Sequence, residues 1–160
     1  CESLGIGDNT EVVTYDGSQS LYAARLWWSL TYYGHQRVKV LDGGWRRWVS
    51  EGRAISFDRA DKRSSVTFTP KIDDTVIARV DELKTVCDNQ DSIIWDVRSS
   101  GEYDGSDIGG NERAGHLPGA VNLEWFNVVD RNSHQFKDPK EISKILEDRG
   151  ITPDKPIYSY

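Results

Sequence analysis

Short apolar segments of strand character alternate with amphipathic helical segments along most of this 160-residue chain. The apolar runs predict β-strands at residues 11–15, 37–41, 92–96, 119–123 and 156–160. The helical segments between them end at glycine in three places, Gly34, Gly52 and Gly150. Because parallel strands need a long crossover between them, this alternation predicts an α/β fold with a mainly parallel sheet.

The apolar spacing predicts helices that each turn one set of side chains inward. These sets are Ala23, Leu26, Trp27, Leu30 and Tyr33; Trp45, Trp48 and Val49; Val80, Leu83 and Cys87; and Ile142, Ile145 and Leu146. Asp138 as N-cap and Pro139 in the first turn mark the start of the last helix. The tryptophans could form a platform for a sugar or a cation, but their helical spacing favours packing in the core or between domains.

Residues 59–75 differ from the rest of the chain. Charged residues run into Ser64 and Ser65 and then Pro70, with little sustained periodicity. This pattern is typical of a linker that lies over a surface, with a short strand at residues 66–68.

Composition argues against several classes of protein. The net charge is −6 with no long basic run, so we expect no nucleic-acid partner, and no apolar run approaches the roughly 18–20 residues that cross a bilayer. Two cysteines and three scattered histidines fit neither a disulfide scaffold nor a zinc site, so we expect neither metal nor cofactor. The chain begins with Cys1 and contains no methionine, which predicts a processed or truncated chain; it has no signal-peptide pattern, and we expect it to be cytoplasmic.

An internal repeat relates the two ends of the chain. Gly5 and Gly150 are each followed, ten residues later, by a tyrosine that ends an apolar strand, Tyr15 and Tyr160, and the two segments are 145 residues apart. The repeat aligns Cys1 with Leu146, an inward helix position. It also aligns Asp16 with position 161, directly after the end of this chain.

Motifs from both halves of the chain then suggest a family. In order, they are Tyr15-Asp16, residues 23–28 (AARLWW), Gly34-His35, residues 38–45 (VKVLDGGW) with Trp48, Asp96-Val97-Arg98, Glu102-Tyr103, residues 115–122 (GHLPGAVN) and residues 155–160 (KPIYSY). The first half resembles the closing part of a rhodanese domain and the second half the opening part of another. The chain is therefore similar to the central portion of tandem-domain rhodaneses, the thiosulfate/3-mercaptopyruvate sulfurtransferases.

This resemblance implies a fold and a division of the chain. The fold is a rhodanese-like parallel sheet flanked by helices, present as two incomplete tandem copies. Residues 1–58 are the back half of the first, inactive copy, residues 59–75 are the linker, and residues 76–160 are the front part of the second, catalytic copy.

The resemblance also implies a reaction. In this family a cysteine at the start of a tight loop attacks the outer sulfur of thiosulfate or 3-mercaptopyruvate, forms a persulfide and passes the sulfur to cyanide or a thiol. A strand–loop–helix turn suits this chemistry because its N–H groups and helix N-terminus favour an anion. The resemblance places the nucleophile at position 161, directly after Tyr160, so we expect no catalytic residue and no activity in these 160 residues alone. The expected partners are a small anionic sulfur donor and a cyanide or thiol acceptor, a thioredoxin-like protein being one candidate.

Four residues of the second copy are expected to support the active site. Asp96 and Arg98 would form a charged network that braces the active loop, rather than a plain surface ion pair or a direct substrate contact. Glu102 departs from the family, which often has a cation there to hold the donor, and Arg113 is a candidate replacement. His116 in the GHLPG turn is expected to be structural, with a general base as the alternative.

The first copy has Asp16 where the family has its nucleophile, with Arg25 on the helix that follows. Asp16 can also be explained as an N-cap for a helix that begins near Leu21. His35 is expected to cap the end of that helix. Cys1 and Cys87 are expected to be inert core residues and not sulfur carriers.

Two other functions remain open. A non-catalytic rhodanese module for protein interaction or regulation would have Asp or Gly after Tyr160 instead of Cys. A phosphatase of the related fold would have a longer loop there, and the tandem copies argue against it.

Overall fold

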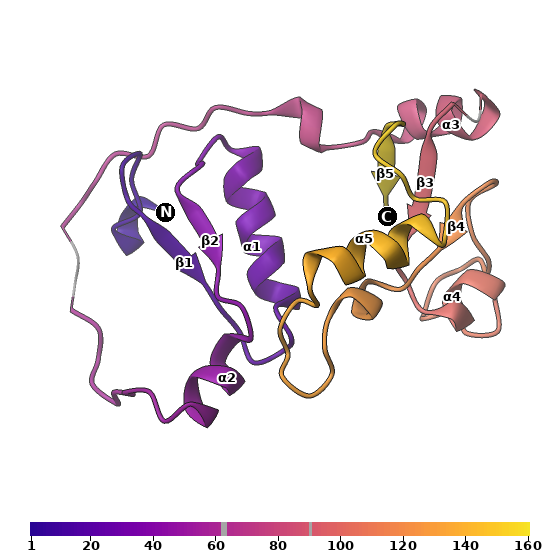
Figure 1. Ribbon diagram of the computed structural model, residues 1–160. Helices are drawn as coiled ribbons and strands as arrows, with labels where there is room; N and C mark the ends of the chain where they lie inside the picture. The colour runs from indigo at the N-terminus through magenta and orange to yellow at the C-terminus, as the bar shows by residue number, and fades with distance from the viewer. Residues whose placement is uncertain (62–63, 90) are drawn as a thin grey trace. The chain divides into compact units, whose positions relative to one another are not determined.

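The computed structural model describes residues 1–61, 64–89 and 91–160, which form two compact units (Figure 1). The first unit contains residues 1–77 and 131–136, and the second contains residues 78–130 and 137–160. Every strand pair is parallel, and helices flank the strands, which confirms the predicted α/β fold. No helix in the described part of the chain has the length and apolar character needed to cross a membrane.

The first unit is built on a two-stranded sheet. Its elements are the 3₁₀ helix η1 (Glu2–Leu4), β1 (Val12–Thr14), α1 (Leu21–Tyr32), β2 (Val38–Val40), α2 (Gly44–Ser50) and the 3₁₀ helix η2 (Asp74–Val76). Strand β1 pairs with β2 from Val12↔Val38 to Thr14↔Val40, and α1 forms the crossover between them (Figure 1). The buried side chains Ala23, Leu30 and Val38 hold α1 on this sheet through apolar burial.

The second unit is built on a three-stranded sheet in the order β4-β3-β5. Its elements are α3 (Val80–Asn89), β3 (Ile93–Asp96), α4 (Ser100–Asp104), β4 (Val121–Asn122), the 3₁₀ helix η3 (Trp125–Val128), α5 (Pro139–Glu147) and β5 (Ile157–Ser159). Ile93, Leu123 and Ile151 form its core cluster, against which Ile145 and Leu146 of α5 pack. The predicted cap of α5 is confirmed, because the Asp138 carboxylate accepts the N–H of Lys140 at 2.9 Å and Pro139 follows in the first turn.

The segment from residue 64 to residue 77 lies on the first unit and is fastened to it by main-chain hydrogen bonds. The N–H of Lys71 donates to the carbonyl of Tyr33 at 2.9 Å, and the N–H of Asp8 donates to the carbonyl of Thr67 at 2.9 Å. Gly34, with φ of 84°, passes so close to this segment that a Cβ would lie 2.5 Å from the carbonyl oxygen of Lys71. The short strand expected at residues 66–68 is wrong, since these residues pair with turns and side chains and not with a strand.

Residues 131–136 also belong to the first unit, although their neighbours in sequence belong to the second. The carboxylate of Asp42 accepts hydrogen bonds from the Gln135 side chain at 2.7 Å and from the Phe136 N–H at 2.9 Å. His134, directly before Gln135, is buried and has a left-handed φ of 61°.

Several expected core positions are exposed instead. Val80 is 71% exposed, because it is the first residue of α3 and little of the described chain covers the start of this helix. Trp27 and Trp45 are 40% and 42% exposed, whereas Trp28 and Trp48 are partly buried and donate their indole N–H groups to main-chain carbonyls. Cys1 is exposed ahead of η1, so its expected inward position is also wrong.

Candidate functional site

The loop between β1 and α1 forms a cradle of main-chain N–H groups around one carboxylate. Asp16, the first residue after Tyr15, receives four of these donors. Its Oδ1 accepts from Ser18 at 2.7 Å and Ser20 at 3.0 Å, and its Oδ2 accepts from Tyr22 and Ala23, both at 2.8 Å. Partial burial raises the pKa of Asp16, but the four N–H donors outweigh it and hold the pKa below its ordinary value.

The backbone of this loop adopts an uncommon conformation to aim its donors. Gln19 and Ser20 both have left-handed φ values, 60° and 69°, although neither is glycine. Ser20 occupies the N-cap position of α1 but makes no capping bond with its side chain. Instead, the carboxylate of Asp16, four residues earlier, accepts the N–H groups of the first turn of α1. The cradle therefore binds an anionic group at the N-terminus of a helix, and here the anion is Asp16 itself.

Arg25 does not contribute to this cradle. It lies exposed on α1, and the contacts that hold Asp16 come from main-chain N–H groups. The opposite side of the loop is fastened to α2, because the N–H of Trp45 donates to the Asp16 carbonyl at 2.8 Å. A Cβ at Gly44 would lie only 2.5 Å from the same carbonyl oxygen, so this close approach requires glycine.

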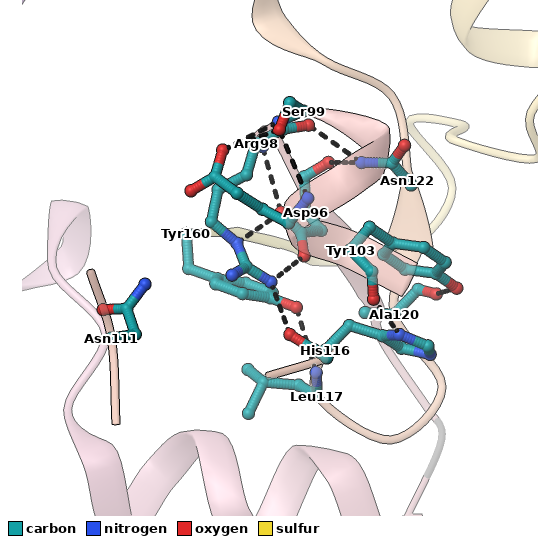
Figure 2. A network of polar contacts seen from close by, with 12 residues as sticks. Asp96, Arg98, Ser99, Tyr103, Asn111, His116, Leu117, Ala120, Asn122 and Tyr160 are labelled. Atoms are coloured by element: carbon teal, nitrogen blue, oxygen red, sulfur yellow. Dashed lines mark hydrogen bonds and ion pairs between the residues drawn. The ribbon is translucent and has the colours of Figure 1, made fainter. Parts of the chain in front are cut away.

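In the second unit, Asp96 and Arg98 form a two-pronged ion pair at the end of β3 (Figure 2). Arg98 donates from Nε to Oδ1 at 3.0 Å and from Nη2 to Oδ2 at 2.6 Å, while its N–H also donates to Oδ1 at 3.0 Å. The Asp96 side chain is completely buried, and that of Arg98 is 25% exposed. Burial raises the pKa of Asp96, but the hydrogen bonds from Arg98 hold it below its ordinary value.

The same pair reaches the turn at residues 115–119 and the end of β5. Arg98 Nη2 donates to the carbonyl of Gly115 at 3.0 Å, and its guanidinium lies 5.3 Å from the centre of the Tyr160 ring. Asn122 of β4 donates to the carbonyls of Asp96 and Arg98 at 3.2 and 3.0 Å. These contacts gather three segments of the chain where the carboxyl ends of parallel strands meet, the edge at which open α/β sheets place their sites (Figure 2).

Glu102 and His116 make separate local contacts. Glu102 forms a capping box at the start of α4, where its carboxylate accepts from Oγ of Ser99 at 2.9 Å and from the Ser99 N–H at 3.2 Å. The ring of His116 stacks on Tyr103 with centroids 3.7 Å apart, and its Nδ1 lies 2.8 Å from the Tyr103 carbonyl (Figure 2). Both residues therefore make these contacts at α4, and Arg113 lies exposed in the loop between them.

The remaining candidates lie outside these sites. Cys87 is half-buried on α3 and Cys1 is exposed, and both are free thiols. The His35 main-chain N–H donates to the carbonyl of Leu30 at 2.8 Å and closes the end of α1. The ring is not the cap: it is buried against Phe68, and its Nε2 has no hydrogen-bond partner in the described part of the chain.

Sequence reasoning missed the contributions of Tyr160, Asn122 and Ser99. The serine had a usable signal, since Ser99 followed three residues later by Glu102 is the sequence of a capping box. Tyr160 and Asn122 had none, because their partners are 24 or more residues away in the chain.

Comparison of the sequence with known proteins identifies the family of this chain. The rhodanese-like domain family matches residues 2–51 and 79–160, and the chain belongs to that family. Over 156 residues it is 30% identical to a thiosulfate sulfurtransferase of Gallus gallus, covering 96% of this chain and 53% of that protein. The chain spans about half the length of the curated relatives it matches.

Two solved structures extend the likeness to the fold. The 3-mercaptopyruvate sulfurtransferase SseA of Escherichia coli superposes with a TM-score of 0.87 at 25% identity, over 99% of this chain and 58% of that one. EanB in complex with ergothioneine superposes with a TM-score of 0.86 at 30% identity, over 99% of this chain and 43% of that one. The homologues include tandem sulfurtransferases, and the chain is a member of a sulfurtransferase family with the rhodanese fold.

Proposed function

We propose that the protein containing this chain moves a sulfane sulfur from thiosulfate, or from 3-mercaptopyruvate, to cyanide or a thiol through a cysteine persulfide. The observation that carries the proposal is the cradle of four N–H groups around Asp16. The internal repeat aligns the strand before this cradle with β5, so the same strand–loop–helix arrangement is expected after Tyr160. A thiolate placed there as Asp16 is placed here would be held in its anionic form.

The reaction needs one nucleophile and two exchange steps. The thiolate attacks the outer sulfur of thiosulfate, a new S–S bond forms, and the original S–S bond breaks as sulfite leaves with the electron pair. The acceptor then attacks the outer sulfur of the persulfide, and the thiolate is released. With cyanide as the acceptor, the product is thiocyanate. The N–H cradle supports both steps because the active sulfur is anionic before the first step and again after the second.

The two copies have different roles in this proposal. Asp16 fills the cradle of the first copy with a carboxylate that cannot accept a sulfane sulfur, so this copy is structural. In the second copy, Asp96 and Arg98 brace the edge of the sheet from which the active loop begins. The division at residues 1–58, 59–75 and 76–160 is part of the same proposal.

The acceptor is the least constrained part of the reaction. Cyanide and small thiols fit the resemblance to thiosulfate sulfurtransferases, and a thioredoxin-like protein is a candidate thiol. The likeness to EanB structures that hold ergothioneine or hercynine, and to a related enzyme in complex with trimethyl histidine as its natural substrate, adds a trimethylated histidine as a candidate acceptor.

The test uses the full-length protein that contains these residues. After incubation with thiosulfate, intact-mass spectrometry is expected to show one added sulfur atom, and cyanide is expected to remove it as thiocyanate. Replacing the residue after Tyr160 by serine should abolish both results, whereas Cys87→Ser, the matched change at another thiol, should leave them unchanged. The 160-residue chain alone should form no thiocyanate.

Two results would overturn the proposal. If aspartate or glycine follows Tyr160, a non-catalytic module is favoured. If the sulfur adduct is lost in Cys87→Ser, the sulfur carrier is the half-buried thiol of α3.

A further inference from the structure

Tyr160 is held at both its main chain and its side chain. Its N–H donates to the carbonyl of Trp95 at 3.2 Å, and its carbonyl accepts from the N–H of Val97 at 3.1 Å, which continues the pairing of β5 with β3. At the far end of the side chain, the hydroxyl accepts from the Leu117 N–H at 3.0 Å (Figure 2). The ring lies 5.3 Å below the guanidinium of Arg98, which is paired with the buried carboxylate of Asp96.

These contacts leave the side chain with few alternative positions. The hydroxyl accepts the Leu117 N–H, and the main chain is paired with β3 through both its N–H and its carbonyl. The Arg98 guanidinium covers the ring at 5.3 Å. A tyrosine fixed at its hydroxyl, ring and main chain gives the next residue in the chain a fixed starting point and direction.

The equivalent residue of the repeat has different surroundings. Tyr15 also ends a strand, directly before Asp16, but it is 58% exposed and stacks on Trp45 at 6.4 Å. Both tyrosines precede the expected loop position. Among the described residues, the Tyr160 hydroxyl is joined to the turn at residues 115–119 and its ring lies against Arg98. The anchored tyrosine is thus found in the copy that is proposed to be catalytic.

We propose that Tyr160 is a positioning residue for sulfur transfer, whose hydroxyl ties the start of the active loop to the turn at residues 115–119. This role rests on the proposed function, because it assumes that the sulfur carrier follows Tyr160. A nucleophile held in the attacking geometry lowers the barrier of the chemical step, and small displacements of it are costly. The hydroxyl should therefore affect turnover much more than donor binding.

The test compares Tyr160→Phe with Tyr15→Phe in the full-length protein. Each variant removes one hydroxyl and keeps the ring at the same position of the repeat. We expect Tyr160→Phe to lower kcat about tenfold, the scale of one lost hydrogen bond in a barrier, with KM for thiosulfate nearly unchanged. Tyr15→Phe should leave both parameters unchanged.

Amide hydrogen exchange supplies a readout independent of activity. In Tyr160→Phe the Leu117 amide loses its acceptor and should exchange faster. The Ala120 amide is the reference within the same turn, because it donates to the carbonyl of Leu117 at 3.0 Å and does not contact Tyr160 through this bond. Its exchange should stay unchanged if the turn remains folded.

Each contrary result has a distinct meaning. Wild-type turnover in Tyr160→Phe would overturn the positioning role while leaving the proposed function in place. Faster exchange at both Leu117 and Ala120 would show a general loss of structure and would also overturn it. A wild-type protein that acquires no sulfur from thiosulfate would overturn the proposed function, and the positioning role with it.

Discussion

Arg98 is the partner that neutralises Asp96, a carboxylate with no exposed side-chain surface, and the two are joined at 2.6 and 3.0 Å. Such a pair is costly to break from one side because the remaining charge stays buried. Asp96 and Arg98 are two residues apart in sequence. The contact between them therefore requires that β3 and the turn after it are both formed.

Arg98→Ala should therefore destabilise the second unit by about 3 kcal/mol. Lys84→Ala is the matched control, because Lys84 forms an ion pair with Asp81 at 3.3 Å in which both side chains are largely exposed. That change should alter stability by about 0.5 kcal/mol or less. Urea denaturation of the three proteins measures both values, and equal losses would contradict the structural role of the buried pair.

Asp16→Asn tests the cradle through its pH dependence. The folded-state pKa of Asp16 lies below its ordinary value, so the carboxylate contributes stability above that ordinary value, about 4, and loses it as the pH falls through the folded-state pKa. The asparagine variant should be less stable by about 1–2 kcal/mol at neutral pH, because its amide cannot accept all four N–H groups.

The difference in stability between the two proteins should shrink as the pH falls through the folded-state pKa of Asp16, because the folded carboxylate is then protonated. Thermal unfolding followed from pH 7 to pH 2.5 measures the difference. Asp91→Asn, at an exposed position, is the control for removing one charge. A difference between Asp16→Asn and wild type that stays constant with pH would show that the carboxylate charge is not what the cradle binds.

Gly34→Ala tests whether the segment at residues 64–77 is fastened to the first unit. A Cβ at Gly34 would meet the Lys71 carbonyl at 2.5 Å, and φ there is 84°. Gly52 is the matched control, since its φ is 65° and a Cβ there would have no neighbour within 4 Å. We expect Gly52→Ala to cost about 1 kcal/mol for the left-handed backbone and Gly34→Ala at least about 2 kcal/mol.

Limited proteolysis provides a second measurement. Cleavage within residues 64–77 should increase in Gly34→Ala and not in Gly52→Ala. Equal stability and equal cleavage in the two variants would mean that residues 64–77 are not packed against the end of α1.

Glu102 is expected to affect stability and not donor binding. Glu102→Gln keeps an acceptor for the capping box, so it should be nearly neutral, whereas Glu102→Ala should cost about 1 kcal/mol. Because the carboxylate is turned toward Ser99, removing its charge should leave KM for thiosulfate in the full-length protein almost unchanged. A large fall in KM for Glu102→Gln would show instead that the charge faces the donor.

The strands and helices could be predicted because they depend on local patterns. All five expected strands are present, each within its expected range, since apolar runs bounded by turns leave few alternatives. The short helix α4 was missed because five residues are too few to show periodicity, although the Ser99–Glu102 spacing marks its start.

The candidate sites were predicted in part. The resemblance predicted a charged network of Asp96 and Arg98, and the sequence placed Asp16 before a helix; the structure has the ion pair and the helix. The sequence could not supply the N–H donors of the cradle, since these depend on left-handed backbone at Gln19 and Ser20, which residues other than glycine rarely adopt. Nor could it join Leu117 to Tyr160, which lie 43 residues apart.

The membership of residues 131–136 in the first unit has a consequence for folding during synthesis. Asp42 leaves the ribosome 93 residues before Gln135 and 94 before Phe136, both of which donate hydrogen bonds to its carboxylate. Contacts of such separation form late and slow the folding of a chain. The first unit cannot complete itself as it emerges, because the carboxylate of Asp42 lacks these two donors until most of the second unit has been translated.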